Sequence, residues 1–172
     1  MQDLGYRVWV LAGCLMALTL ILTGAIAGFF YAYTSSVMRG LDAIPAAHAI
    51  VAMQGINATV RNWMFAPAFF GTPVAAVATG ALLGWLQHKR AAGLMFLAAI
   101  IYIAGAFLPT LLVNVPMNET LATVTVPADP QAADYLWREY SAPWTWWNTL
   151  RTLFSFASLL FVGLAIFVSA RR

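Results

Sequence analysis

Four long apolar runs constrain the fold of this chain more than any other feature of its sequence. They lie at about residues 8–34, 65–86, 91–113 and 150–170. An α-helix needs about 20 residues to cross roughly 30 Å of hydrocarbon, and each run is near or above that length. Within the runs the only charged residue is Arg151, at the start of the fourth. The sequence therefore predicts an all-α, four-helix transmembrane bundle, a single integral membrane domain over residues 1–172.

The composition supports a membrane protein and excludes an ordinary soluble domain. Hydrophobic residues make up 62% of the chain and charged residues only 9%, against roughly 25% charged residues in soluble domains. The first run resembles a signal peptide at Ala25-Ile26-Ala27, but the apolar stretch before this point is too long for one and continues beyond it. We therefore expect an uncleaved first span, which tilts or projects beyond the bilayer.

Basic residues are concentrated at one predicted end of the bundle. The N-terminus, the turn between spans two and three and the C-terminus together hold Arg7, Lys89, Arg90, Arg171 and Arg172. The positive-inside rule then puts both termini in the cytoplasm, and we expect a bacterial inner (cell) membrane. The net charge of +3 reflects this topology, so we expect membrane lipid as a partner and no nucleic acid. Oligomerisation stays open.

Two long segments, Thr34–Met64 and Asn114–Arg151, face the outer side in this topology, whereas the turn Gln87–Arg90 is short. We expect the long segments to fold as an extracytoplasmic helical cap over the bundle. The stretch from Ala46 to Asn62 favours a helix with an apolar face. That helix either lies flat at the membrane interface or directs Gln54 and Asn57 into the mouth of the bundle.

The second outer segment contains a proline that we expect to break the third helix. Pro116 follows Asn114, and Asn118 lies one turn further on. An unwound backbone near the membrane needs hydrogen-bond partners, which asparagine side chains supply. We therefore expect Asn114 and Asn118 to cap the broken helix, and the stretch from Gln131 to Tyr140 to form a separate short helix.

The entrance to the fourth span carries a polar stripe. Trp144, Asn148 and Arg151 are spaced i, i+4 and i+7, so they share one face of a helix. Because a charged residue is costly in hydrocarbon, this face is expected to point into the bundle. The sequence therefore predicts a site between span four and the cap. An interfacial aromatic belt remains the alternative, with Arg151 stacked on Trp147 as a cation–π anchor.

Short motifs along the chain resemble those of a known family. In order, they are Phe29-Phe30-Tyr31-Ala32-Tyr33, Ser36-Val37-Met38, Gly40-Leu41, Ala52-Met53-Gln54, Ile56-Asn57, Phe70-Gly71, Asn114-Val115-Pro116, Asn118, Trp144, Trp147-Asn148 and Arg151-Thr152. The series resembles the anthrone-oxygenase-like family of small four-helix membrane proteins, from about Gly28 to Thr152. The chain departs from that pattern at Arg39, where we expect proline, and at Thr149, where many relatives have histidine.

The resemblance implies oxidation of an anthrone- or quinone-like hydrophobic aromatic small molecule, with dioxygen as co-substrate and no evident cofactor. It implies catalytic roles for Arg151, Asn148 and Asn57, which would stabilise the enolate oxygen or hold hydroxyl groups. The residues that would bind substrate are Trp144, Trp147, Gln54, Asn114, Asn118 and Phe70. Because Thr149 replaces the histidine, the general base is open; His48, Glu119 and Glu139 are the candidates.

Non-catalytic functions fit the same pattern. The pocket could bind or transport a small hydrophobic ligand, or the chain could be an accessory subunit. Cys14 is the only cysteine, which excludes an intramolecular disulfide and a cysteine-based metal site. His48 and His88 lie on opposite predicted sides of the membrane, so we expect no metal site.

Overall fold

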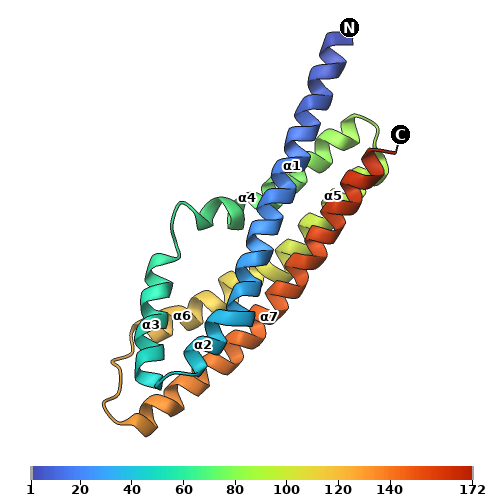
Figure 1. Ribbon diagram of the computed structural model, residues 1–172. Helices are drawn as coiled ribbons and strands as arrows, with labels where there is room; N and C mark the ends of the chain where they lie inside the picture. The colour runs from blue at the N-terminus through green and yellow to red at the C-terminus, as the bar shows by residue number, and fades with distance from the viewer. Residues whose placement is uncertain (1, 172) are drawn as a thin grey trace.

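Four helical segments, among the residues that the structure describes, are long and apolar enough to cross a membrane. They are Gly5–Asp42, Phe65–Trp85, Lys89–Ala122 and Pro130–Ser169. The structure is a computed structural model that describes residues 2–171 as an elongated helical bundle (Figure 1). The predicted all-α fold with four membrane-spanning helices is thereby confirmed.

The helices are continuous through several local changes of geometry. The first span is α1 (Gln2–Ala32), a π-helical turn η1 (Tyr33–Val37) and α2 (Met38–Asp42). The third span is α5 (Lys89–Tyr102), the π-helical turns η2 (Ile103–Phe107) and η3 (Thr110–Asn114), and α6 (Val115–Ala122). The remaining helices are α3 (Ala46–Thr59), α4 (Phe65–Trp85) and α7 (Pro130–Ser169).

The membrane-spanning helices pack as a ring in which α1 and α5 each contact both α4 and α7. Hydrogen bonds between helices supplement apolar packing. The hydroxyl groups of Thr19 on α1 and Thr79 on α4 are 2.9 Å apart, and Ser158 Oγ on α7 donates to the Ala98 carbonyl on α5 at 2.9 Å. Large apolar side chains cover much of the outer surface, as expected for helices that face lipid.

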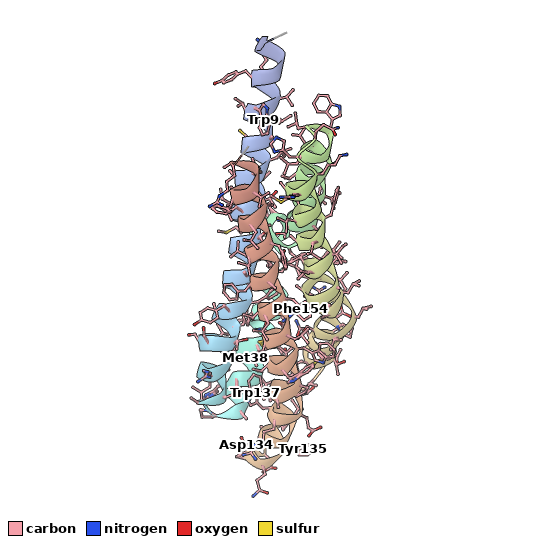
Figure 2. The ribbon with its side chains drawn as sticks, turned by 90° about the vertical axis from the view of Figure 1, so that its right-hand side faces the viewer. Trp9, Met38, Asp134, Tyr135, Trp137 and Phe154 are labelled. Carbon is pink, nitrogen blue, oxygen red and sulfur yellow. The ribbon has the colours of Figure 1, made fainter. Side chains whose placement is uncertain are left out.

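Both termini and the turn between α4 and α5 lie at one end of the bundle, where α1 projects beyond its neighbours (Figure 1). The rings of Trp9 and His88 meet edge to face at this end, 4.7 Å apart. Figure 2 shows Trp9 far from Asp134 and Tyr135, which mark the opposite end. The three basic segments of the orientation argument, the two chain ends and the turn between α4 and α5, therefore lie at the same end of the bundle. Arg172 and the side chain of Asp3 lie outside the described part.

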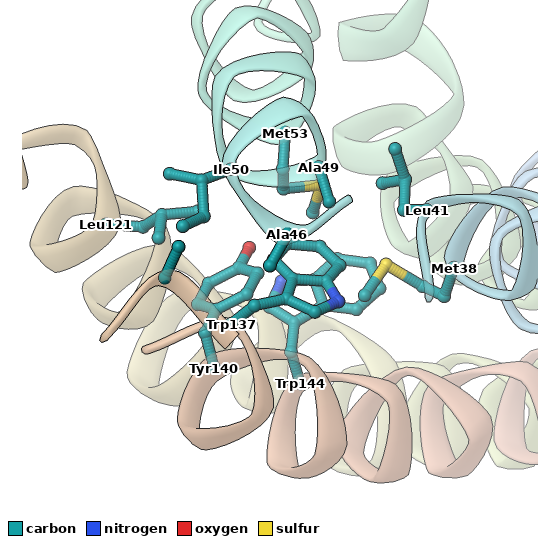
Figure 3. Close-up of a cluster of buried hydrophobic side chains, with 11 residues drawn as sticks. Met38, Leu41, Ala46, Ala49, Ile50, Met53, Leu121, Trp137, Tyr140 and Trp144 are labelled. Atoms are coloured by element: carbon teal, nitrogen blue, oxygen red, sulfur yellow. The ribbon is translucent and has the colours of Figure 1, made fainter. Parts of the chain in front are cut away.

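The opposite end of the bundle carries the cap. Helix α3 packs against α7 and α6, and its buried face (Ala46, Ala49, Ile50 and Met53) covers the aromatic side chains of α7 (Figure 3). Trp137 Nε1 and Ser141 Oγ donate to the same carboxylate oxygen of Asp42, at 2.8 and 2.6 Å. Trp137 is therefore buried within the cap and is not part of an interfacial aromatic belt.

Two predicted helix ends are wrong. Pro116 lies in the first turn of α6, directly after η3, and the third span continues through it. Pro143 lies inside α7, so the predicted short helix from Gln131 and the fourth span form one helix of 40 residues. A proline inside a helix costs about 3 kcal/mol or more. At Pro143, burial of the neighbouring aromatic side chains against α3 offsets that cost.

Candidate functional site

Arg151 lies in the interior of the bundle, with only 4% of its surface exposed. Its Nη1 atom donates to Thr110 Oγ1 at 3.0 Å, and its Nη2 atom donates to Asn148 Oδ1 at 2.8 Å. Trp144 and Asn148 are buried beside it on the same helix. The structure therefore places the predicted stripe on the inner face of α7, whereas the catalytic role of the stripe stays a prediction.

Two aromatic rings enclose the guanidinium group. Its Cζ atom lies 4.5 Å from the centroid of the Phe30 ring and 5.2 Å from that of Trp144. These partners replace Trp147, which packs edge to face on Trp146 at 4.9 Å. The alternative in which Arg151 and Trp147 form an interfacial anchor is therefore wrong, because the cation faces the bundle interior.

Asn148 connects α7 to the end of α1. Its Nδ2 atom donates to the carbonyl oxygen of Phe30 at 2.8 Å and to Thr34 Oγ1 at 2.7 Å. Its Oδ1 atom accepts from Arg151. Both polar ends of this amide are therefore engaged within the protein, and the side chain holds Arg151 and α1 in a fixed relation.

A second network links the cap to the same place. Asn57 Nδ2 donates to Tyr140 Oη at 3.3 Å, and Tyr140 Oη donates to Asn118 Oδ1 at 2.8 Å. Trp144 Nε1 donates to the same oxygen of Asn118, also at 2.8 Å. Among the described residues, Asn57 has no direct hydrogen bond to Arg151 and is connected to it through Tyr140, Asn118 and Trp144.

The other two predicted amides fix the end and the start of α6. Gln54 Nε2 donates to the carbonyl oxygens of Leu121 and Val124, at 2.9 and 3.0 Å. Asn114, which is 1% exposed, donates through Nδ2 to the Trp144 carbonyl at 3.4 Å. Asn114 Oδ1 has no hydrogen-bond partner among the described residues. The expected capping of a broken helix is absent there because α6 continues the third span.

Three π-helical turns in the described part of the chain pack against α7, the helix that carries Arg151. Thr34, which binds Asn148, belongs to η1, and Thr110, which binds Arg151, belongs to η3. In η2, Gly105 lies so close to the Phe154 side chain that any Cβ would overlap it. Such wide turns are rare in helices and are frequent at functional sites. No sequence pattern indicated them.

A pocket of about 480 Å³ opens between the start of α4 and the outer part of the third span. We call it the lateral pocket. Its lining residues are Arg61, Asn62, Trp63, Phe65, Ala66, Phe69, Phe70, Thr110, Leu111 and Val115. Thr110 is 8% exposed and is also the residue that accepts from Arg151. The Thr110 side chain therefore connects the lateral pocket with the buried guanidinium group of Arg151. Neither Thr110 nor this pocket was identified from the sequence.

The candidate bases lie away from Arg151. His48 is exposed on α3, and Glu139 lines a separate apolar groove of about 530 Å³ between α6 and α7, which we call the cap groove. Glu119 Oε1 accepts from Arg61 Nη2 at 3.2 Å, at the edge of the lateral pocket. Among the described residues, no group of three or more His, Cys, Asp or Glu side chains is arranged to hold a metal ion.

Comparison with protein families gives one finding that bears on this site. The family model for anthrone oxygenase matches residues 61–161, more than half of the chain. The matched region runs from Arg61 at the edge of the lateral pocket through α4, the third span and most of α7, and it includes Thr110 and Arg151. Among curated proteins and solved structures, none matches this chain.

Proposed function

This chain belongs to the anthrone oxygenase family, and we therefore propose that it is a membrane oxygenase acting on a flat, lipophilic aromatic substrate. In this proposal the substrate is anthrone- or quinone-like, dioxygen is the co-substrate, and the reaction takes place in the lateral pocket. Family membership supports the choice of reaction class, and the lining of the lateral pocket supports the choice of location.

One observation carries the proposal. The lateral pocket is lined by Phe65, Phe69 and Phe70, and its Thr110 hydroxyl lies 3.0 Å from the buried guanidinium of Arg151. The Phe65 and Phe69 rings are stacked, with centroids 5.3 Å apart. Flat aromatic walls suit a polycyclic substrate, and a fixed positive charge behind one wall stabilises negative charge that develops on a bound oxygen.

The reaction asks little of the protein beyond this electrostatic support. The carbon between the two aromatic rings loses a proton and becomes an electron-rich enolate, which reacts with dioxygen. One oxygen atom ends in the new carbonyl group and the other leaves as water. Because a nearby cation makes the enolate easier to form, it lowers the demand for a strong general base.

The predicted site residues take different roles in this scheme. Phe70 contacts the substrate, and Arg151 acts on the enolate oxygen from behind Thr110. Asn148 positions Arg151, and Trp144 packs on its cationic face. Gln54, Asn57, Asn114, Asn118 and Trp147 act in this scheme only by holding the cap and helices in place.

The test is oxygen uptake by purified, detergent-solubilised protein supplied with a simple anthrone. We expect protein-dependent uptake that falls at least tenfold in Thr110→Val and further in Arg151→Gln. Thr120→Val is the matched control, because it makes the same change on α6 in the cap groove, and its activity is expected to stay unchanged. Wild-type uptake no faster than spontaneous oxidation would refute the proposal.

A non-catalytic ligand-binding protein is the second candidate. The groups beside Arg151 favour this candidate. Its hydrogen-bond partners, Thr110 and Asn148, are both neutral, and neither is a base strong enough to remove the substrate's proton. This function predicts that the wild type quenches the fluorescence of a bound anthrone without speeding its oxidation. Binding together with accelerated uptake would exclude it.

For the location we propose a bacterial inner membrane with both termini in the cytoplasm and the cap outside. The test uses single cysteines in a Cys14→Ser background and a membrane-impermeant maleimide on intact cells. Ala128→Cys in the cap is expected to react directly, whereas Ala170→Cys is expected to react only after permeabilisation. The reverse pattern would invert the proposed topology.

A further inference from the structure

Arg151 is a cation whose contacts in the described structure are all uncharged. Its hydrogen-bond partners are the Thr110 hydroxyl and the Asn148 amide, and its two ring contacts are Phe30 and Trp144. Its Nε atom has no hydrogen-bond partner among the described residues. Ring faces and neutral dipoles reduce the cost of burying a charge, but a buried charge is ordinarily paired with an opposite one.

The surrounding titratable groups do not provide that opposite charge. The ones that interact with Arg151 are the phenols of Tyr33, Tyr102 and Tyr140, which are neutral in their ordinary form at pH 7. At the edge of the lateral pocket, Arg61 and Glu119 pair with each other. Their side chains are 59% and 62% exposed, so solvent screens them.

The lateral pocket is where an opposite charge could approach. Thr110 lines the pocket, and its Oγ1 atom accepts from Arg151 at 3.0 Å and donates to the Ala106 carbonyl at 2.8 Å. An anionic ligand oxygen that replaces the Ala106 carbonyl as the acceptor of the single Thr110 hydroxyl hydrogen would lie within about 6 Å of the guanidinium group. Apart from Arg61 and Asn62, the other lining residues are apolar, so few protein groups would compete with Thr110 for this oxygen.

We propose that the lateral pocket binds its ligands as anions. The favoured class is a polycyclic aromatic molecule with an acidic phenolic or enolic hydroxyl, whose ionised oxygen lies at Thr110 and serves as the counter-charge of Arg151. Neutral lipophiles of the same shape, such as unsubstituted anthraquinone, bind more weakly. This inference rests on the proposed function for the choice of pocket, and it narrows the substrate class.

The size of the effect follows from Coulomb's law. At about 6 Å and an effective dielectric constant of about 20, a unit positive charge lowers the pKa of a bound hydroxyl by roughly two units. This shift corresponds to about 100-fold tighter binding of the anion than of the neutral form of the same ligand. Arg61 contributes much less, because it is exposed and already paired with Glu119.

The experiment titrates bound 2-hydroxyanthraquinone, whose neutral and anionic forms absorb at different wavelengths. We expect its pKa on the purified wild-type protein to lie about two units below its pKa in protein-free micelles of the same detergent. Arg151→Gln should remove most of the difference. Arg61→Gln, the matched control for an arginine at the same pocket, should change it by less than about half a unit.

A bound pKa equal to or above the micelle value would overturn the proposal, as would failure of the dye to bind. The comparison of wild-type protein with micelles decides whether the pocket binds the anion, so the test remains valid if Arg151→Gln does not fold. In that case Arg151→Lys is measured instead, and it should retain the pKa shift because it retains the positive charge. The dye is already oxidised and consumes no oxygen. Its titration can therefore fail while anthrone oxidation succeeds, or succeed while oxidation fails.

Discussion

Replacing Tyr102 with phenylalanine removes one hydroxyl group from the bundle interior, and the structure gives a specific reason why its loss destabilises the protein. Pro73 lies inside α4 and has no N–H, so it cannot donate to the carbonyl oxygen of Phe69, four residues before it. Tyr102 Oη donates to that oxygen instead, at 2.9 Å. Without this hydroxyl, a backbone acceptor would remain unpaired in an apolar interior.

The expected cost of Tyr102→Phe is about 1–2 kcal/mol of the free energy of unfolding. An unpaired buried polar group costs about 1–3 kcal/mol in proteins, while hydrogen bonds between transmembrane helices reach at most about 1.7 kcal/mol. The measurement is equilibrium unfolding by SDS in mixed micelles. Tyr135→Phe is the control, because this exposed tyrosine on α7 lies at the far end of the cap.

A double-mutant cycle tests the reason as well as the size. Pro73→Ala restores an N–H that can pair with the Phe69 carbonyl. In that background Tyr102→Phe should therefore cost less than about 0.5 kcal/mol. An equal cost in both backgrounds would refute the argument that the hydroxyl compensates for the proline. A Tyr102→Phe variant as stable as the wild type would refute it directly.

Two further predictions concern the π-turn region and the cap. Gly105→Ala should lower the free energy of unfolding by several kcal/mol, because its Cβ would overlap Phe154. Phe154→Ala should restore part of the loss in the same unfolding assay. A Gly105→Ala protein as stable as the wild type would contradict the close packing of Gly105 on Phe154. Asn118→Ala should cost about 2–4 kcal/mol because it leaves the Tyr140 hydroxyl and the Trp144 indole N–H without their acceptor. In that variant, hydrogen exchange should increase in α6; unchanged exchange would mean that the network does not hold the cap.

The parts of the fold that sequence could predict depend on local patterns. The length of an apolar run defines a span, and the spacing of Trp144, Asn148 and Arg151 places them on one helix face whatever surrounds it. The buried face of α3 also follows from periodicity. These predictions needed only the geometry of a single helix, and the structure confirms the spans, the cap and the inward direction of the stripe.

The parts that could not be predicted depend on contacts between distant segments. Phe30 and Thr110 lie 121 and 41 positions from Arg151 along the chain, and no local pattern selects them over other side chains. The separate short helix predicted from Gln131 to Tyr140 was wrong for a related reason. The helix-breaking tendency of Pro143 is a local property, whereas the packing of α7 against α3 that offsets it is not. The π-helical turns carry no sequence signature at all.

Each of those turns accommodates one residue more than an α-helical turn does, so the orientation of the site depends on where in a helix the number of residues changes. A π-helical turn closes its hydrogen bonds one residue later than an α-helical turn. Deleting a single residue from η3, such as Val113, would restore α-helical spacing and leave the helix beyond it in about its present orientation. A deletion from regular α-helix, such as Leu97 in α5, would instead rotate everything beyond it by about 100°, and Asn118 would turn away from α7. Relatives that lack one residue at η3 would therefore keep the same orientation of the cap above the same four spans.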